Sequence, residues 1–167
     1  MYTNSDSGQT SLIIHPFQPV YNSQSRILIL GSFPSQASRT QQFYYGHPQN
    51  RFWPLIASLL QRQQPRTITE KKELLYYHGI ALYDAVSACT INKSEDASID
   101  AVHPSNLDAI FQAADIQAVF TNGSKAYEIC TKHMGIAAVK LPSTSPANAR
   151  FRFTDLEHAW KDILRYI

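Results

Sequence analysis

One uninterrupted apolar run, Ile27-Leu28-Ile29-Leu30, most constrains what this chain can fold into. A run of this length without polar alternation is typical of a strand that is buried on both faces of a sheet. Gly31 and Pro34 end the run, and a glycine lets the backbone approach a ligand closely. Ligands of open parallel sheets bind just beyond the carboxyl ends of the strands. We therefore expect a ligand site directly after this run.

Three further apolar segments predict the other strands of a sheet, and helix signals separate them. The predicted strands are Ile80 to Val86, Gln117 to Thr121 and Ala137 to Leu141. Single helix caps are expected at Asn50, before a helix that runs to Leu60, and at Ser124. Capping boxes are expected for three pairs of residues, which are Thr67 with Glu70, Ser105 with Asp108, and Thr154 with Glu157. Because strands and helices alternate, we predict an α/β layered domain with a mainly parallel sheet of about four strands.

The segments outside these strands and helices are expected to lack regular structure, and the chain is expected to form one domain. Residues 1–11 are polar and predict a loose N-terminal tail, which leaves 12–167 as a single domain. Pro16 and Pro19 interrupt the apolar segment from Leu12 to Val20, so we expect an extended segment draped over the domain. The stretch from Cys89 to Ser98 is predicted to be a polar loop.

Composition excludes several classes of protein. Cys89 and Cys130 are isolated from each other, which disfavours an iron–sulfur cluster or a structural zinc and predicts two buried thiols. There is no signal-peptide pattern and no apolar run of the roughly 18 residues that a membrane span needs, so a cytoplasmic protein is expected. The net charge of +2 permits a polyanionic partner without requiring one. We expect a monomer without metal or cofactor.

The predicted strand ends bring a particular set of side chains to one edge of the sheet. They deliver Gly31 to Pro34, Asp84, Asn122, and Ser143 to Asn148. Amides, hydroxyls and aromatic rings dominate this set, whereas paired carboxylates, a serine nucleophile elbow and a phosphate-binding glycine loop are missing from the sequence. Such a site suits a reaction in which the protein binds, orients a water and stabilises charge on a leaving group.

Several residues of this region also have a purely structural interpretation. Asn50 alone is equally well explained as a helix cap, and Asp84 is better explained as a carboxylate that bonds a loop than as a general base. Phe52 and Trp53 are expected in the core, and His47, before a proline, is expected to shape a turn.

Three motifs together resemble the uracil-DNA glycosylase superfamily, and most closely its hypoxanthine-DNA (deoxyinosine) glycosylase branch. They are Gly31-Ser-Phe-Pro-Ser35, Tyr44-Tyr-Gly-His-Pro-Gln-Asn-Arg-Phe-Trp53 and Leu141-Pro-Ser-Thr-Ser-Pro-Ala-Asn148. The second motif is also similar to the mismatch-specific uracil-DNA glycosylases. The resemblance implies a three-layer α/β/α sandwich and an enzyme that flips a deaminated base out of single- or double-stranded DNA. Hydrolysis of the N-glycosidic bond would then leave an abasic site, without a metal.

The resemblance also implies roles for individual residues. Asn50 would be the catalytic residue, either holding the water or contacting the lesion, and Tyr45 would stack on the flipped base. The residues expected to bind substrate are Gly31, Ser32, Phe33, Pro34, Tyr44, Tyr45, His47 and Asn122. The residues expected to contact DNA are Ser143, Thr144, Ser145, Pro146, Ala147, Asn148 and Arg150.

One departure from the superfamily pattern concerns the loop after the first strand. Many members carry an acid or amide there, but this chain has Ser32 and Phe33, which disfavours efficient action on uracil.

Three hypotheses follow for the function. The first is a hypoxanthine-directed DNA glycosylase, with a uracil- or mismatch-specific enzyme as its variant. The second is a non-catalytic binder of damaged DNA or nucleotides, and the third is a small-molecule hydrolase such as a nucleoside hydrolase.

Overall fold

A parallel sheet of four strands forms the centre of the chain. In a computed structural model that describes residues 10–92 and 99–167, the strand order is β3-β2-β6-β7. These strands are β2 (Ile27–Gly31), β3 (Ile80–Asp84), β6 (Ala118–Asn122) and β7 (Val139–Leu141). All three pairings between them are parallel. The four predicted strands and their parallel arrangement are confirmed.

Strand β2 is buried on both faces, as its unbroken apolar sequence predicts. All of its residues are buried, and it pairs with β3 on one side and β6 on the other. Ile27 and Ile29 pack into one hydrophobic cluster, whereas Leu28 and Leu30 pack into another. Because side chains alternate across a strand, these two clusters lie on opposite faces of the sheet.

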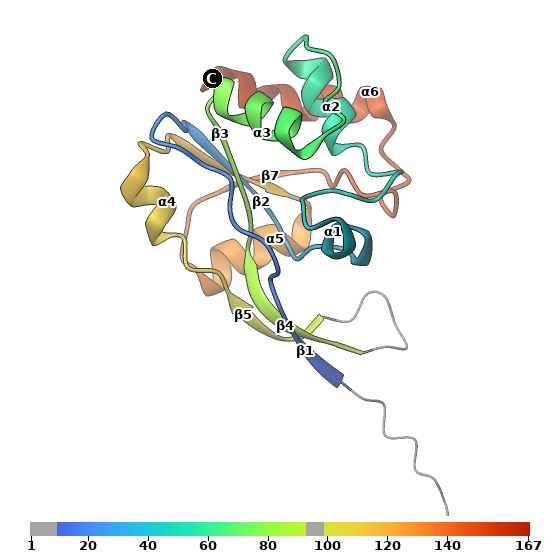
Figure 1. Cartoon of the computed structure of the whole chain (residues 1–167), viewed down its shortest axis with the longest axis vertical. Coiled ribbons are helices and arrows are strands. Elements are labelled where there is room, and N and C mark those ends of the chain that lie inside the picture. Colours follow the sequence, from blue (N-terminus) through green and yellow to red (C-terminus); the bar gives the residue numbers. More distant parts are fainter. Residues whose placement is uncertain (1–9, 93–98) are drawn as a thin grey trace, which may run out of the picture.

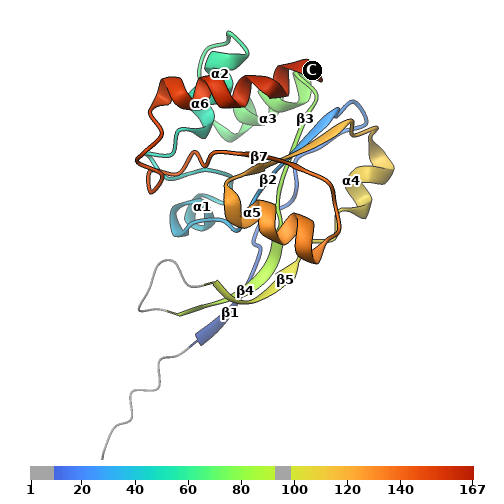
Figure 2. The same cartoon turned by 180° about the vertical axis from the view of Figure 1, so that it is seen from behind.

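Helices cover both faces of this sheet, which gives the expected three layers (Figures 1 and 2). The larger cluster lies under α2 (Phe52–Leu59), α3 (Ile68–Tyr77) and α6 (Phe153–Trp160). The smaller cluster lies under α4 (Asp108–Ala113) and the helix formed by α5 (Ser124–Glu128) and its π-helical continuation η1 (Ile129–His133). The chain ends in a 3-10 turn, η2 (Lys161–Arg165).

A second, antiparallel sheet lies below the first and was not predicted (Figure 1). Its order is β1-β4-β5, formed by β1 (Thr10–Ile14), β4 (Val86–Asn92) and β5 (Ile99–Pro104). The predicted polar loop from Cys89 is therefore wrong for residues 89–92, while 93–98 lie outside the described residues. The predicted strand Ile80 to Val86 is two strands, because the chain leaves the parallel sheet after Asp84 and enters the other at Val86.

The N-terminal segment is extended, as its prolines predict. The backbone of Val20 pairs with Leu82 of β3, and His15 donates its backbone N–H to Ser87 O at 2.7 Å. The tail boundary at residue 11 is wrong, because β1 already pairs with β4 from Thr10 onward. Residues 1–9 lie outside the described part of the chain.

The helix starts were predicted with mixed success. The capping box of Thr67 and Glu70 is confirmed, since each side chain bonds the backbone N–H of the other residue. The box at Ser105 is wrong, because the Ser105 hydroxyl donates to Asp84 O instead, and α4 starts at Asp108.

Two further helix starts differ from the prediction, and one helix was missed. Ser124 is the first residue of α5 rather than its cap, which is Gly123 at φ +95°. The expected box at Thr154 is wrong, since α6 instead begins with Arg152 donating its N–H to the Asp155 carboxylate. A short helix, α1 (Gln36–Gln41), was not predicted.

The two threonines make a matched pair for a stability test. Thr67→Ala removes the side-chain acceptor for Glu70 N, so we expect the free energy of unfolding to fall by about 1 kcal/mol. Thr154→Ala changes an exposed residue that caps nothing, and it should change stability by less than about 0.5 kcal/mol. Urea unfolding of both variants at neutral pH measures the difference. Equal losses would show that the box on α3 contributes nothing of its own.

Candidate functional site

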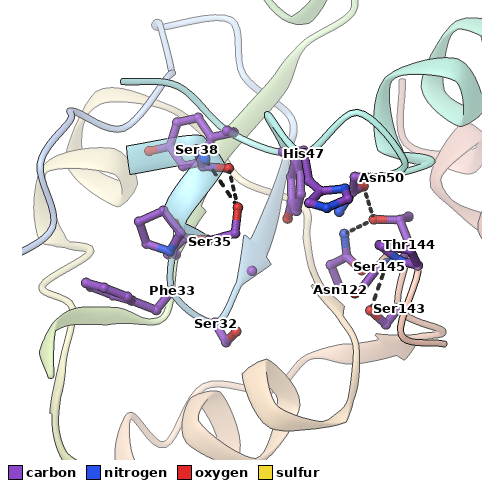
Figure 3. A pocket seen from close by; sticks show the side chains of 16 residues that line it. Ser32, Phe33, Ser35, Ser38, His47, Asn50, Asn122, Ser143, Thr144 and Ser145 are labelled. Carbon is purple, nitrogen blue, oxygen red and sulfur yellow. Dashed lines mark hydrogen bonds between the residues drawn. The ribbon is translucent and has the colours of Figure 1, made fainter. Parts of the chain in front are cut away.

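The carboxyl ends of the parallel strands surround a cavity of about 240 Å³. This volume is below the roughly 300–1,000 Å³ of pockets for drug-sized ligands, so it suits one small group. The lining residues are Gly31, Ser32, Phe33, Pro34, Ser35, Ser38, Tyr44, Tyr45, His47, Asn50, Asp84, Asn122, Ser143, Thr144, Ser145 and Pro146 (Figure 3). The structure therefore brings together Asn50, all the residues predicted to bind substrate, and four of those predicted to contact DNA.

Three predicted DNA contacts lie outside the cavity wall. The Asn148 side chain donates to Ser143 O at 3.0 Å and braces the loop from within. Ala147 is exposed next to it. Arg150 is exposed and borders a separate shallow hollow near the start of α6.

A directional chain of hydrogen bonds links three polar side chains in the cavity wall (Figure 3). The backbone N–H of Thr144 donates to Asn122 Oδ1 at 2.9 Å, so the Asn122 NH₂ group must face the Thr144 hydroxyl. That hydroxyl accepts from Asn122 Nδ2 at 2.9 Å and donates in turn to Asn50 Oδ1 at 2.9 Å. Because a backbone N–H can only donate, the main chain sets the direction of the whole chain of bonds.

The consequence for Asn50 is that its amide oxygen is already engaged. Oδ1 accepts a second hydrogen bond from Phe52 N, also at 2.9 Å, at the start of α2. The predicted helix cap at Asn50 is wrong by one residue, because the cap of α2 is Arg51, yet Asn50 Oδ1 still bonds the N–H of the first helical residue. The predicted place of Asn50 in the cavity is confirmed. What Asn50 offers to a ligand is its NH₂ group, which is a donor.

Arg51 holds the loop that follows β7 against α2. Its guanidinium donates to Ser145 O at 2.8 Å, to Asn148 O at 3.1 Å and to Phe151 O. Its backbone N–H donates to Thr144 O at 3.1 Å. Arg51 stands next to Asn50 in the sequence, so the same turn positions the amide and fixes the loop that lies beside it in the cavity wall.

Turn geometry places the remaining residues of this wall. Asn50 N donates to His47 O at 2.9 Å, and Gln49 N donates to His47 Nδ1 at 3.1 Å, which confirms that His47 shapes the turn. The exposed imidazole of His47 nevertheless borders the cavity. Ser35 and Ser38 also line it, and they were missed because α1, which Ser35 caps, was not predicted.

The two tyrosines occupy different environments. Tyr44 is buried and its hydroxyl donates to Gln18 O at 2.9 Å. Tyr45 adopts a left-handed backbone conformation at φ +54°, and its ring stacks on Phe52 with centroids 4.1 Å apart. The Tyr45 hydroxyl is buried and has no hydrogen-bond partner in the described part of the chain. Burial, and then the negative charge of Asp84, raises the pKa of both phenols. Phe52 and Trp53 are buried in the core, as predicted.

Asp84, which was expected at this edge of the sheet but was given no role in binding or catalysis, lines the cavity. Asp84 is only 3 % exposed, and its Oδ2 lies 2.7 Å from Nε2 of His15. Burial raises the pKa of the Asp84 carboxyl, while the hydrogen bond and charge of His15 lower it. The two residues are 69 positions apart, and no local sequence signal connects them.

Within residues 10–92 and 99–167, no group of three His, Cys, Asp or Glu side chains is arranged to hold a metal ion. Among the same residues, no helix has the length and apolar character that crossing a membrane requires. Cys89 and Cys130 are both free and buried, as predicted.

Comparison with known proteins places this fold and cavity in one family. The model of the uracil DNA glycosylase superfamily matches residues 18–164. The chain belongs to this superfamily.

Relatives within the superfamily match over most of their length. A hypoxanthine DNA glycosylase of Methanosarcina acetivorans is 31% identical over 159 residues, which cover 93% of this chain and 100% of that protein. A hypoxanthine DNA glycosylase of Methanosarcina barkeri is 33% identical over 138 residues, covering 80% of this chain and 87% of that protein. The solution structure of a putative uracil DNA glycosylase from M. acetivorans superposes with a TM-score of 0.74 at 31% identity. It covers 91% of this chain and 99% of that one. The superfamily fold expected from the motifs is confirmed.

The bond from Thr144 to Asn50 gives a testable consequence for this superfamily member. Thr144→Val keeps the side-chain shape but removes the hydroxyl, which leaves a buried amide hydrogen of Asn122 unpaired. We expect a loss of about 1–3 kcal/mol in the free energy of unfolding. Thr144→Ser keeps the hydroxyl and should lose less than Thr144→Val when both are measured by urea unfolding. A larger loss for Thr144→Ser would mean that the methyl group, not the hydroxyl, carries the stabilisation.

Proposed function

We propose that this protein is a monofunctional DNA glycosylase that hydrolyses the N-glycosidic bond of a deaminated base, above all hypoxanthine. The observation that carries the proposal is a cavity of about 240 Å³, lined mainly by amides, hydroxyls and aromatic rings, at the carboxyl ends of a parallel sheet. The names of the two Methanosarcina relatives support hypoxanthine as the base. One chain supplies every residue that lines the cavity, so we expect a monomer to be active.

The proposed chemistry follows from what the cavity offers. An enzyme of this kind must turn the target nucleotide out of the base stack and into the pocket. As the glycosidic bond breaks, negative charge develops on the leaving base and positive charge on the sugar. Donors fixed in advance stabilise such charge without reorganisation. The NH₂ group of Asn50, held by Thr144 and Phe52 N, is the donor we assign to the leaving base.

The walls of the cavity would hold the base and the DNA. Tyr45 rests on Phe52 and lines the cavity, so we assign it the face on which the base stacks. The loop from Ser143 to Arg150 is held by Arg51, and we propose that it enters the minor groove and contacts phosphates. Ser32 and Phe33 offer no carboxylate or side-chain amide after β2, which supports hypoxanthine over uracil as the better substrate.

Two substitutions of Asn50 test the function and the role of its NH₂ group together. Asn50→Ala removes the donor, so we expect single-turnover release of hypoxanthine from duplex DNA to fall by about 10²- to 10³-fold. Asn50→Asp keeps an acceptor for Thr144 and Phe52 N but replaces the NH₂ group by an oxygen. It should lose at least as much activity as Asn50→Ala.

The assay separates the competing hypotheses. Duplexes with hypoxanthine, uracil or xanthine are incubated in EDTA, treated with alkali and resolved on a gel. Strands that stay intact with every lesion would overturn the glycosylase and favour a non-catalytic DNA-binding protein. Full activity in Asn50→Asp would show that Asn50 acts as an acceptor for water. Turnover of free inosine without DNA would favour a nucleoside hydrolase.

A further inference from the structure

A groove of about 890 Å³ opens off the mouth of the cavity, and nothing in the chemistry described so far uses it. It lies between α1 and Ile91 of β4, where α1 stands above the antiparallel sheet in Figures 1 and 2. Five residues line both the groove and the cavity, and they are Ser32, Phe33, Pro34, Ser35 and His47. The groove and the cavity are therefore continuous.

The groove leaves the cavity on the side away from the loop that follows β7. Figure 3 shows Phe33 and Ser35 on one side of the cavity, and Thr144 and Ser145 on the other. No residue of that loop lines the groove. A strand whose nucleotide enters the cavity must leave the mouth in two directions, because the strand continues on both sides of the flipped nucleotide. The loop from Ser143 to Arg150 accounts for one direction, and the groove lies along the other.

The groove has the chemistry of a site for a single strand of nucleic acid. Its α1 wall carries hydroxyls, amides and one guanidinium, which come from Ser35, Gln36, Arg39, Thr40 and Gln41. None of the described residues that line it is Asp or Glu, so no carboxylate there repels a phosphate. Phe33 and Ile91, both partly exposed, add an aromatic ring and an aliphatic surface. Sites for single strands combine positive charge along the backbone with aromatic rings on which bases stack.

Arg39 supplies positive charge to this groove and is held in place. Its Nη1 donates to Pro34 O at 2.8 Å, which ties the side chain to the loop after β2. Arg39 forms no ion pair with any residue that the structure describes. A guanidinium carries five N–H donors, so the bond to Pro34 leaves others for a ligand. A fixed charge that no carboxylate neutralises favours an anion such as a phosphate.

The occupant follows from the continuity of the groove with the cavity. Building on the glycosylase function proposed above, we propose that the groove holds the nucleotide next to the flipped one in the same strand, in an unpaired state. Arg39 contacts the phosphate of this neighbouring nucleotide, and Phe33 supplies surface for its base. The volume of the groove is in the range that suits a ligand as large as one nucleotide.

The proposal defines a class of substrates. A neighbouring nucleotide that is already unpaired enters the groove without cost, whereas a paired one must first be unpaired and unstacked. A deaminated base in a single strand, or beside a mismatch, is therefore a better substrate than the same base in a fully paired duplex. The preference comes from the neighbour of the lesion and not from the lesion itself.

Ala37 allows the groove to be blocked without touching the cavity, because it lines only the former of the two. Ala37→Glu adds a carboxylate to the groove, and Ala37→Gln adds nearly the same volume without charge. Ala37 lies in the first turn of α1, where a negative charge is favourable, so both variants should fold. We expect Ala37→Glu to bind single-stranded DNA about 3- to 10-fold more weakly than Ala37→Gln. Fluorescence anisotropy measures binding of a labelled strand with a tetrahydrofuran abasic analogue at its centre.

Arg39 is tested through the salt dependence of the same binding. Arg39→Met removes the charge, so the slope of log Kd against log salt concentration should become shallower by about 0.7, the value for one phosphate of a single strand. Arg39→Lys keeps the charge and should keep most of the slope, whereas loss of a purely structural bond to Pro34 would leave the slope unchanged in both variants. Arg62→Met is the matched control, because Arg62 lines a separate hollow beside the C-terminal end of α3.

Shortened strands identify the nucleotide that the groove holds. The strand is trimmed from one end or the other until no nucleotide follows the abasic analogue on that side. Loss of the nucleotide in the groove should weaken binding to the wild type by about 10-fold and hardly change binding to Arg39→Met. Loss of the nucleotide on the other side should affect the two proteins equally. Release of hypoxanthine from duplexes should be faster when the neighbouring pair is mismatched, and Ala37→Glu should reduce this gain.

The outcomes separate this proposal from the proposed function. Equal losses in wild type and Arg39→Met on trimming either end, or equal binding by Ala37→Glu and Ala37→Gln, would overturn the groove and leave the glycosylase intact. A wild type that binds as proposed but releases no base would overturn the glycosylase and leave the groove. Circular dichroism melts report whether each variant is folded, and if Arg39→Met is not, the two Ala37 variants decide.

Discussion

The pairing of β2 between β3 and β6 is the constraint on which the rest of this molecule depends. Parallel register places Gly31 opposite Asp84 and Leu30 opposite Thr121, so the ends of neighbouring strands arrive at one level. Both faces of β2 are covered, and its backbone is bonded on both sides. The residues that follow these strands therefore start from rigid positions. Loops built on such a base hold polar groups with the precision that a small cavity requires.

Local sequence signals were enough to predict the central sheet and much of the cavity. The apolar run of β2, the glycine that ends it and the motif around Asn50 are each contiguous, so their structural meaning does not depend on distant residues. The antiparallel sheet was missed for a different reason. Its strand β4 contains small and polar residues, such as Ser87 and Ala88, and is stable through pairing with β1 and β5 rather than through its own pattern.

The parts of the cavity that could not be predicted are those that depend on contacts across the fold. His15 and Asp84 meet only because the N-terminal segment runs along β3, and neither residue has a neighbour in sequence that reveals the pair. Arg51 sits inside a recognisable motif, but its bonds to three carbonyls of the loop after β7 depend on tertiary structure. Ser105 shows the converse, since its capping pattern was overridden by a bond to Asp84 O.

The chain of bonds from Asn122 through Thr144 to Asn50 has a thermodynamic consequence. All of its members are ordered in the protein alone, and a main-chain N–H fixes the direction at each end. The rotational entropy of these side chains is lost during folding, so none of it remains to be lost when a base arrives. A base transferred into this cavity should therefore meet a surface that is already rigid. The main entropic cost of recognition then falls on the nucleic acid, which must unstack and bend.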